Sequence, residues 1–241
     1  MKILKPYERL AELYDKDWGD FSLKYVDIIH RLGLKITITP KTAIDIACGT
    51  GNLISVLSEN FSVVGSDISE SMIEIARAKY PKLTFIVSDM AEIKPRGKFG
   101  LVLCPFDSIN YTLSLDALRR AFQNVFTLLS DDGVFLFDFN TERLMKDKHR
   151  GIVKREVYDV KFTQTCIYHP IKKIAETVFD FGNSEREIHL QKPYSFSDIK
   201  TLLEKIGFEL LYASDMFEDT EVKEGSYKIM IQCRKFMSFP R

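Results

Sequence analysis

The stretch AIDIACGTGNL, residues 43–53, is a short apolar run that ends at two glycines. Such a run predicts a buried strand over residues 42–47, and the apolar residues of 52–59 predict a helix directly after it. Residues 48–51 then form a tight strand-to-helix turn, where Gly49 and Gly51 permit backbone angles and close approaches that a Cβ would block. At such a turn, free N–H groups and the positive end of the helix dipole face a nucleotide-like ligand. Glycines that serve packing alone are the other interpretation.

Strand and helix patterns alternate on either side of this turn. Amphipathic spacing and glycine or serine boundaries predict helices at residues 7–14, 21–32, 52–59, 70–80, 115–129 and from Ser195 to Gly207, with Ser69 and Ser195 as N-caps. Strands are expected at residues 42–47, 61–65, 83–87, 99–104, 134–139, 208–214 and 227–233, with a turn at Asp132-Gly133. This alternation predicts an α/β fold with a parallel sheet covered on both faces.

The pattern changes between residues 151 and 194. Residues 152–162, 166–169, 174–181 and 188–194 have β-like composition without helical spacing, with a hairpin turn at Gly182-Asn183. We therefore expect residues 1–150 and 195–241 to form one α/β domain, with residues 1–35 as an N-terminal helical lid and residues 151–194 as a β-rich insert.

Composition limits the class of protein. The 241 residues contain 34 Lys and Arg and 34 Asp and Glu, and this zero net charge argues against broad nucleic-acid binding. None of the four cysteines stands in a CxxC pair, so no metal site is predicted, and a reducing, cytoplasmic location fits best. The charged N-terminus lacks a secretory apolar core, and no apolar run is long enough to span a membrane.

Acidic residues follow the second and third strands of the predicted sheet. The carboxyl ends of parallel strands share one edge, where ligands bind. Asp67 is placed to accept hydrogen bonds from both hydroxyls of a ribose, although it could instead cap the next helix. Asp89 could accept from the exocyclic amine of an adenine while Met90 supplies an apolar face, although Asp89 could also be an ordinary loop residue.

Two nucleotide-binding motifs are incomplete or absent at this turn, which limits the type of nucleotide that it could bind. Ile54 stands where the dinucleotide fingerprint GxGxxG has its third glycine, and there is no GxxxxGK[ST] motif of a P-loop. A nicotinamide-dependent oxidoreductase is thereby disfavoured and stays an alternative, as does a regulatory protein that binds the nucleoside without catalysis.

Three segments together resemble the motif series of S-adenosylmethionine-dependent methyltransferases of the seven-stranded Rossmann-like class: IDIACGTGNL, VVGSDISESMIEIAR and FIVSDMAEI. The segments YERLAELYD, LVLCPFDSINYT and EIHLQKPYSFSDIKTLLEKIGF are similar to those of a bacterial subgroup of small cytosolic methyltransferases. The resemblance implies a doubly wound sheet of seven strands, mostly parallel with an antiparallel last strand. It also implies an inserted antiparallel β layer over the acceptor site, and S-adenosylmethionine as the cofactor, released as S-adenosylhomocysteine.

The resemblance also implies roles for single residues. Asp45 and the turn would hold the amino-acid part of the cofactor, Asp67 its ribose, and Asp89 and Met90 its adenine. Tyr14, with Tyr7 beside it, would close over the cofactor. The full set of expected cofactor contacts is Tyr14, Asp45, Ala47, Cys48, Gly49, Gly51, Asp67, Ile68, Met72, Asp89, Met90 and Phe106.

An acceptor that must lose a proton could need a general base. Asp107, Asn110, Tyr111 and His189 are the candidates for this catalytic work, although Asn110 and Tyr111 could order their loop and His189 could be structural. The stretch DSINY departs from the Asp/Asn-Pro-Pro-Tyr pattern used on amino groups of bases and of glutamine. We therefore expect a small-molecule acceptor, no membrane partner, and a monomer or homodimer. RNA or protein stays open as the acceptor, and the basic residues of 146–155 could form a face for RNA or a solvated loop. Aromatic residues of the insert could wall the acceptor pocket: Tyr158, Phe162, Tyr168, Phe179, Phe181 and Tyr194.

Overall fold

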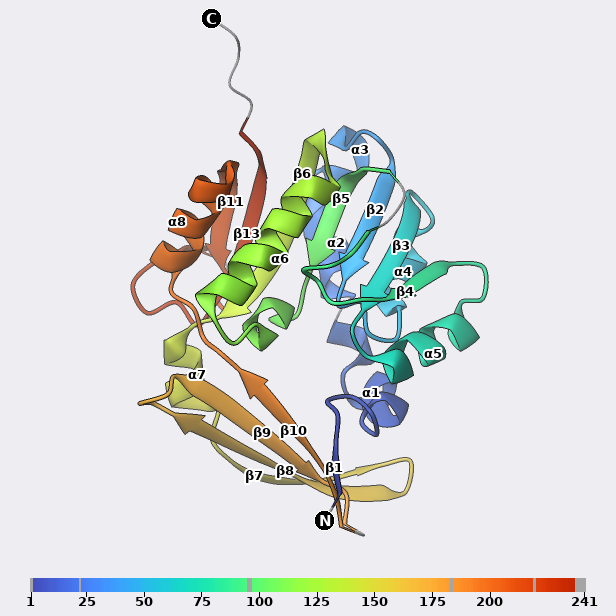
Figure 1. The fold of residues 1–241 in the computed structure, drawn as a ribbon, viewed down its shortest axis with the longest axis vertical. Coiled ribbons are helices and arrows are strands. Elements are labelled where there is room, and N and C mark those ends of the chain that lie inside the picture. The colour runs from blue at the N-terminus through green and yellow to red at the C-terminus, as the bar shows by residue number, and fades with distance from the viewer. Residues whose placement is uncertain (1, 22, 95–96, 183, 219, 237–241) are drawn as a thin grey trace, which may run out of the picture.

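The computed structural model describes residues 2–21, 23–94, 97–182, 184–218 and 220–236, which form two β-sheets with helices around the larger one (Figure 1). The larger sheet has the order β12-β11-β13-β6-β5-β2-β3-β4. Strands β6, β5, β2, β3 and β4 are parallel, whereas β13 is antiparallel to both of its neighbours. The bounds are β2 (Thr42–Ile46), β3 (Ser62–Asp67), β4 (Thr84–Val87), β5 (Phe99–Cys104), β6 (Leu129–Asn140), β11 (Phe208–Asp215), β12 (Thr220–Glu221) and β13 (Lys228–Lys235). The predicted fold class is confirmed, and two-residue β12 is an addition at one edge.

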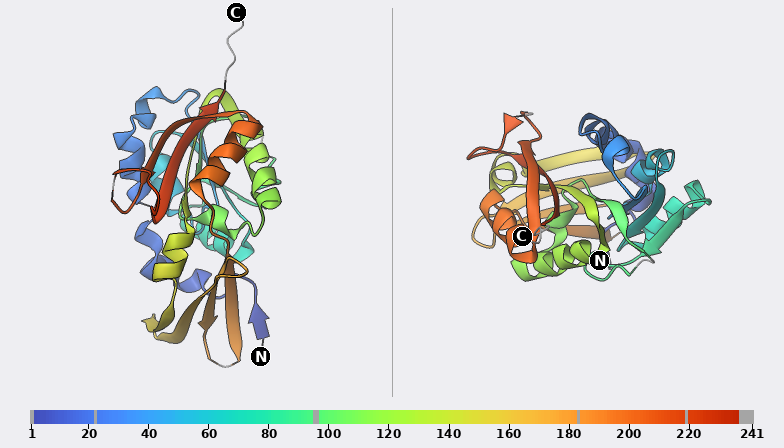
Figure 2. Two further views of the ribbon diagram at one scale, coloured as in Figure 1. Left: turned by 90° about the vertical axis from the view of Figure 1, so that its left-hand side faces the viewer. Right: turned by 90° about the horizontal axis from the view of Figure 1, so that it is seen from above.

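Apolar residues of this sheet face two separate cores. In β5, Val102 and Cys104 belong to the core under α6 and α8, whereas Leu101 and Leu103 belong to the core under α2, α4 and α5. Every residue of β5 is buried because helices cover both faces, as the end-on view of Figure 2 shows. The helix bounds are α1 (Ala11–Asp17), α2 (Lys24–Arg31), α3 (Leu34–Thr37), α4 (Asn52–Leu57), α5 (Glu70–Lys79), α6 (Leu115–Leu128), α7 (Glu142–Lys148) and α8 (Phe196–Ile206). None of these helices is long and apolar enough to cross a membrane.

Predicted caps set the ends of two helices. The hydroxyl of Ser69 accepts a hydrogen bond from Met72 N–H at the start of α5, and that of Ser195 accepts from Asp198 N–H at the start of α8. Gly207 ends α8 in the left-handed conformation, with φ of 109°.

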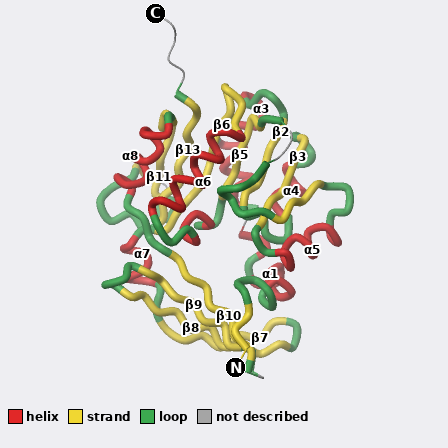
Figure 3. The backbone as a smooth tube through the Cα atoms, in the orientation of Figure 1, coloured by secondary structure: helices red, strands yellow, loops and turns green. Residues whose placement is uncertain are grey.

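The smaller sheet has the order β1-β10-β9-β8-β7 and lies beyond the carboxyl ends of the parallel strands (Figure 3). Four of its strands are antiparallel neighbours from the region of the predicted insert: β7 (Gly151–Val157), β8 (Val160–His169), β9 (Ile174–Asp180) and β10 (Glu185–Gln191). The fifth, β1 (Lys2–Leu4), pairs in parallel with β10 and was not predicted, because three residues carry too little pattern. It brings the N-terminal segment onto the insert.

Three local predictions were wrong. Residues 152–162 form two strands, because Tyr158 and Asp159 both adopt positive φ and make a hairpin turn. At Asp132-Gly133 strand β6 bulges against β5 instead of turning. The first helix begins at Ala11 rather than at residue 7, since Tyr7 has a φ of 62°. Asn183, from the predicted turn Gly182-Asn183, lies outside the described residues.

Candidate active site

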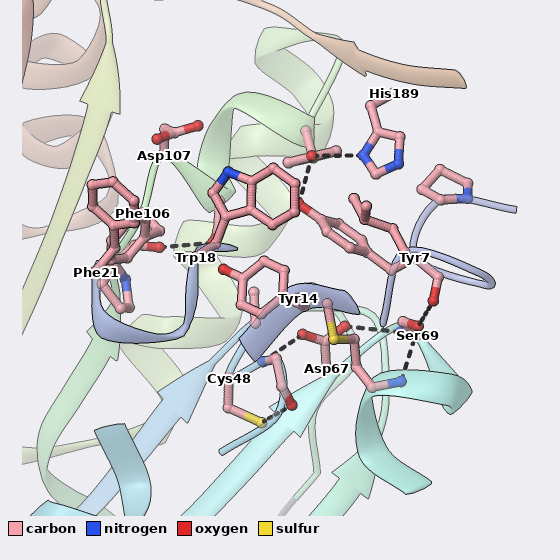
Figure 4. Close-up of a pocket in the computed structure, with 18 of the residues that line it drawn as sticks. Tyr7, Tyr14, Trp18, Phe21, Cys48, Asp67, Ser69, Phe106, Asp107 and His189 are labelled. Atoms are coloured by element: carbon pink, nitrogen blue, oxygen red, sulfur yellow. Dashed lines mark hydrogen bonds between the residues drawn. The ribbon is translucent and has the colours of Figure 1, made fainter. Parts of the chain in front are cut away.

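A cavity of about 1520 Å³ lies between the carboxyl ends of β2, β3 and β5 and the smaller sheet (Figure 4). Side chains from the N-terminal segment, the strand ends and strands β9 and β10 line it together. It brings together most of the residues expected from sequence: Tyr14, Asp45, Ala47, Cys48, Gly49, Asp67, Ile68, Met72, Met90, Phe106, Asp107, Tyr111 and His189. Gly51, Asp89 and Asn110 are not among its lining residues.

Asp67 fixes the turn that follows β2. Its carboxylate accepts hydrogen bonds from Gly49 N–H and from Ser69 N–H, each at 2.9 Å. A carboxylate offers about four acceptor positions, so acceptor capacity remains for a ligand. Burial raises the pKa of Asp67, and these backbone N–H groups oppose that rise. Asp67 therefore orders the start of α5 and also lines the cavity, and its binding to a ribose stays a prediction.

The two glycines of the turn do different work. Gly49 lines the cavity with a φ of 55°, and a Cβ there would lie 3.9 Å from Tyr14. Gly51 has a φ of 84° and packs away from the cavity, where a Cβ would come within 2.9 Å of the Phe85 ring. The spacing that predicted a ligand turn thus combines one residue at the cavity with one needed for close packing.

Asp45 is a buried carboxylate at the floor of the cavity. Its side chain is 1 % exposed, and its Oδ1 has no hydrogen-bond partner among the described residues. Burial raises the pKa of Asp45 well above its usual value, and the nearby Asp67 raises it further. An unpartnered buried anion is costly, and a cation in the cavity would offset that cost.

Asp89 and Met90 separate in space. Asp89 is exposed, and its carboxylate accepts from Ala91 N–H at 2.8 Å, closing a turn in its own loop. Met90 lines the cavity, and its carbonyl accepts from the amide of Asn124 at 3.0 Å. Of the two residues expected at an adenine, Met90 lines the cavity and Asp89 does not.

Asp107 is held by an ion pair. Its Oδ1 lies 2.7 Å from the Lys228 ammonium, and its Oδ2 accepts from the Gln191 amide at 2.7 Å. Lys228 also reaches Asp138 at 3.1 Å; burial would lower the pKa of this lysine, but the two carboxylates raise it above its usual value. Because both Asp107 oxygens are engaged, the geometry favours a positioning role over that of a free base. Sequence reasoning missed Lys228, which is remote in the chain.

Asn110 joins three segments below the cavity. Its amide donates to the carbonyls of Asn140 and Lys192 at 3.0 and 2.7 Å, and its oxygen accepts from Asn140 N–H at 2.9 Å. The side chain is fully buried, and it does not line the cavity. Asn110 is therefore placed to order the junction of these segments rather than to contact an acceptor.

The N-terminal segment covers one side of the cavity. The ring of Tyr14 stacks on Trp18 at 6.0 Å and meets Tyr7 edge-on at 6.0 Å. Asp15 anchors α1 to the glycine turn by accepting from Thr50 and from Asn52. Figure 4 places Tyr14 between the turn with Cys48 and Asp67 on one side and the Tyr7–His189 side on the other.

A closed ring of hydrogen bonds lies on the Tyr7–His189 side. The hydroxyls of Tyr7 and Tyr111 are 2.8 Å apart, and the Tyr111 hydroxyl is 3.0 Å from His189 Nδ1. His189 Nε2 is 3.0 Å from Glu187 Oε2, which also accepts from Tyr7 N–H at 2.9 Å. Sequence analysis missed Glu187, although its position two residues before His189 in a strand puts both on one face.

Most of the remaining candidates from the sequence lie outside the cavity. Of the insert aromatics, Phe179 lines the cavity, and the others expected there do not. The basic residues of 146–155 include Lys146, paired with Glu142 at 2.9 Å, and Arg155, paired with Asp17 at 2.8 Å. All four cysteines are free thiols, and among the described residues no cluster of His, Cys, Asp and Glu is arranged to hold a metal ion.

Comparisons with known proteins agree with this geometry. Residues 43–133 match the family model of the methyltransferase domain. A protein of Geobacillus sp. (strain WCH70), named as a methyltransferase without a stated acceptor, is 29% identical over 95% of this chain and 99% of its own. The crystal structure of an S-adenosylmethionine-dependent methyltransferase from Clostridium acetobutylicum ATCC 824 has a TM-score of 0.79, with 22% identity over 96% of this chain and 100% of its own. That of DesVI from Streptomyces venezuelae has a TM-score of 0.72, with 18% identity over 92% and 97% of the two chains. The chain thus resembles the S-adenosylmethionine-dependent methyltransferases over nearly its whole length.

Proposed function

We propose that this enzyme binds S-adenosylmethionine at the glycine turn and transfers its methyl group to a small-molecule acceptor in the remainder of the cavity. The observation that carries the proposal is the pair of buried carboxylates beside the turn. Asp45, with an unpartnered oxygen, would receive the ammonium of the amino-acid part, and Asp67, with acceptor capacity left, would receive the ribose hydroxyls. Ile68, Met72 and Met90 would pack on the adenine.

The cofactor, when bound, supplies a methyl group already activated on a sulfonium. The residues of this chain then have to orient the acceptor, exclude water and receive any proton that it loses. Such orientation can contribute up to roughly 7–11 kcal/mol to lowering the barrier. The N-terminal segment with Tyr7, Tyr14 and Trp18 is suited to excluding water, because its aromatic rings line the cavity.

The size of the cavity supports a small acceptor. Ligand pockets usually measure about 300–1,000 Å³. The 1520 Å³ found here leaves room for a second small molecule beside a cofactor. A relative from Streptomyces fradiae is named as an N,N-dimethyltransferase of a dTDP-amino sugar and is 29% identical over 54% of this chain and 52% of its own. We infer from this likeness that a nucleotide-linked sugar is one acceptor class to test.

The acceptor would lie under the insert, residues 151–194. Thr177 and Phe179 of β9 and His189 and Gln191 of β10 face the cavity, opposite the glycine turn. With Tyr111 and Asp107 from the loop after β5, they would surround the acceptor. The insert would thus serve as the acceptor cap of an otherwise continuous α/β domain.

Titration calorimetry tests the proposal directly. We expect micromolar binding of S-adenosylmethionine and S-adenosylhomocysteine and no binding of NAD. In Asp67→Ala the affinity should fall by about 2 kcal/mol or more, roughly 30-fold, because a buried charged acceptor is lost. Asp89→Ala is the matched control and should change affinity less than about threefold, since Asp89 lies outside the cavity. Binding of NAD alone, or unchanged affinity in Asp67→Ala, would contradict the proposal.

A further inference from the structure

The Glu187 carboxylate receives hydrogen bonds from two separate parts of the cavity wall. Its Oε1 accepts from the backbone N–H groups of Arg9 and Leu10, the latter at 2.8 Å. Its Oε2 accepts from Tyr7 N–H at 2.9 Å and faces His189 Nε2 at 3.0 Å. Glu187 is fully buried, so these contacts replace water around its charge.

This arrangement determines which nitrogen of His189 carries the proton. A carboxylate only accepts, so Nε2 of a neutral His189 must be the protonated nitrogen. Nδ1 then has a free lone pair and accepts from the Tyr111 hydroxyl at 3.0 Å. With its proton on His189, the Tyr111 oxygen in turn accepts from the Tyr7 hydroxyl at 2.8 Å. Every donor in the chain therefore points the same way, toward Glu187.

Tyr7 belongs to this ring through its backbone and its side chain together. Its N–H donates to Glu187, while its hydroxyl meets Tyr111. Tyr7 adopts a φ of 62°, a left-handed conformation that is unfavourable for a bulky residue and usually persists only where the surroundings impose it. Its ring also lies edge-on to the His189 ring, with centroids 4.6 Å apart. Docking of residues 7–10 and the orientation of His189 thus depend on one carboxylate.

We propose that Glu187 is a positioning residue. It orients His189 to act as the proton acceptor of the methyl transfer when residues 7–10 are hydrogen-bonded to the Glu187 carboxylate. This inference rests on the proposed function and narrows its substrate class to acceptors that lose a proton, namely hydroxyls and amines. The acceptor lone pair forms the bond to the methyl carbon, and the electron pair of the broken carbon–sulfur bond stays on sulfur. The acceptor proton passes to a tyrosine hydroxyl oxygen, whose own proton moves along the chain to His189 Nδ1. The resulting imidazolium is stabilised by the Glu187 carboxylate.

The tyrosines are suited to relay a proton without losing their own. Burial raises the pKa of Tyr7 and of Tyr111, so both hydroxyls stay protonated at neutral pH. Both also line the cavity, whereas Glu187 does not, which makes the hydroxyls the point where an acceptor meets the chain. Asp107 is engaged by Lys228 and Gln191, so His189 is the better placed base.

The test uses nitrogen NMR of the imidazoles and amide exchange in the full-length protein without ligand. In the wild type at pH 8, His189 should have a protonated Nε2 and an unprotonated Nδ1, and the amides of Tyr7, Arg9 and Leu10 should be protected. In Glu187→Gln the fixed tautomer should be lost, and protection of those three amides should fall at least tenfold. Glu185→Gln, on the same strand and paired with Lys2 at 4.0 Å, is the matched control and should leave both signals unchanged.

Each outcome decides the matter. A wild-type His189 protonated on Nδ1 overturns the proposal, and this measurement does not depend on how any variant folds. If Glu187→Gln keeps both the His189 tautomer and the protection of the three amides, the proposal is overturned as well. S-adenosylmethionine binding by the wild type, measured by calorimetry, separates the two levels: its absence would refute the proposed function, while the NMR result bears on Glu187 alone.

Discussion

Replacing Asp45 by asparagine should change stability and cofactor affinity in opposite directions. Asp45 is 1 % exposed, its Oδ1 lacks a partner among the described residues, and Asp67 lies near enough to raise its pKa. In the protein without ligand, the neutral amide introduced by Asp45→Asn would remove both the buried charge and its repulsion with Asp67. We expect the free energy of unfolding to rise by at least about 1 kcal/mol, which raises Tm by roughly 2–4 °C in a chain of this size.

The gain should depend on pH in a defined direction. Burial, followed by Asp67, raises the pKa of Asp45 in the folded state. A carboxyl group with a raised folded pKa loses stability as pH increases from its unfolded pKa through its folded pKa. The difference in Tm between variant and wild type should therefore be largest at alkaline pH and disappear below about pH 4, near the ordinary Asp pKa.

The affinity for S-adenosylmethionine should fall in the same variant. A charged hydrogen bond contributes about 1.5–3 kcal/mol, so Kd should rise by roughly 10- to 150-fold. Calorimetry measures the affinity and scanning calorimetry the Tm, with Asp89→Asn as control because Asp89 is exposed. A lower Tm for Asp45→Asn at pH 8, or an unchanged Kd, would refute the assignment of Asp45 to the ammonium.

Two further substitutions test the structural roles of other residues near the cavity. Asn110→Ala removes three hydrogen bonds to backbone groups of Asn140 and Lys192 and should cost about 3–5 kcal/mol of unfolding free energy, measured in urea. The affinity for S-adenosylmethionine should change less than about threefold, and a loss of stability below about 1 kcal/mol would return Asn110 to the catalytic candidates. Gly51→Ala adds a contact with Phe85 at 2.9 Å to the strain of a positive φ and should destabilise by about 2–4 kcal/mol. Gly33→Ala, at φ of 68° with nothing within 4 Å of the added Cβ, isolates the strain at about 1–2 kcal/mol; equal losses at the two glycines would contradict the packing role of Gly51.

The α/β sheet and the residues that line the cavity near the glycine turn could be predicted because their signals are local. The turn after β2 is contiguous, and Asp67 follows the next strand directly, so parallel topology alone brings them to one edge. Asp89 shows the limit of that argument. It also follows a strand, but its carboxylate turns to Ala91 N–H, and no spacing in the sequence distinguishes this loop from that of Asp67.

The side of the cavity near Asp107 and His189 depends on contacts between segments that are far apart in the chain. Lys228 reaches Asp107 only because β13 pairs antiparallel with β6, and that register cannot be inferred from the sequence of either strand alone. The missed hairpin at Tyr158-Asp159 arises similarly, since neither residue is a usual predictor of two consecutive positive φ values. Tertiary packing holds these conformations, so local propensity could not reveal them.

Strand β10 shows how much of this side of the cavity could nevertheless be predicted from the sequence. Alternation puts a row of polar side chains on one face of the strand: Glu185, Glu187, His189 and Gln191. Such a face would ordinarily be expected to meet solvent. In the structure Glu187 and His189 are both nearly or fully buried, and Gln191 reaches Asp107. A polar face that is buried requires partners from elsewhere, and the donors for Glu187 come from residues 7–10. The same strand therefore holds the N-terminal segment and presents the proposed base, which explains why a three-residue β1 pairs with β10 rather than with the larger sheet.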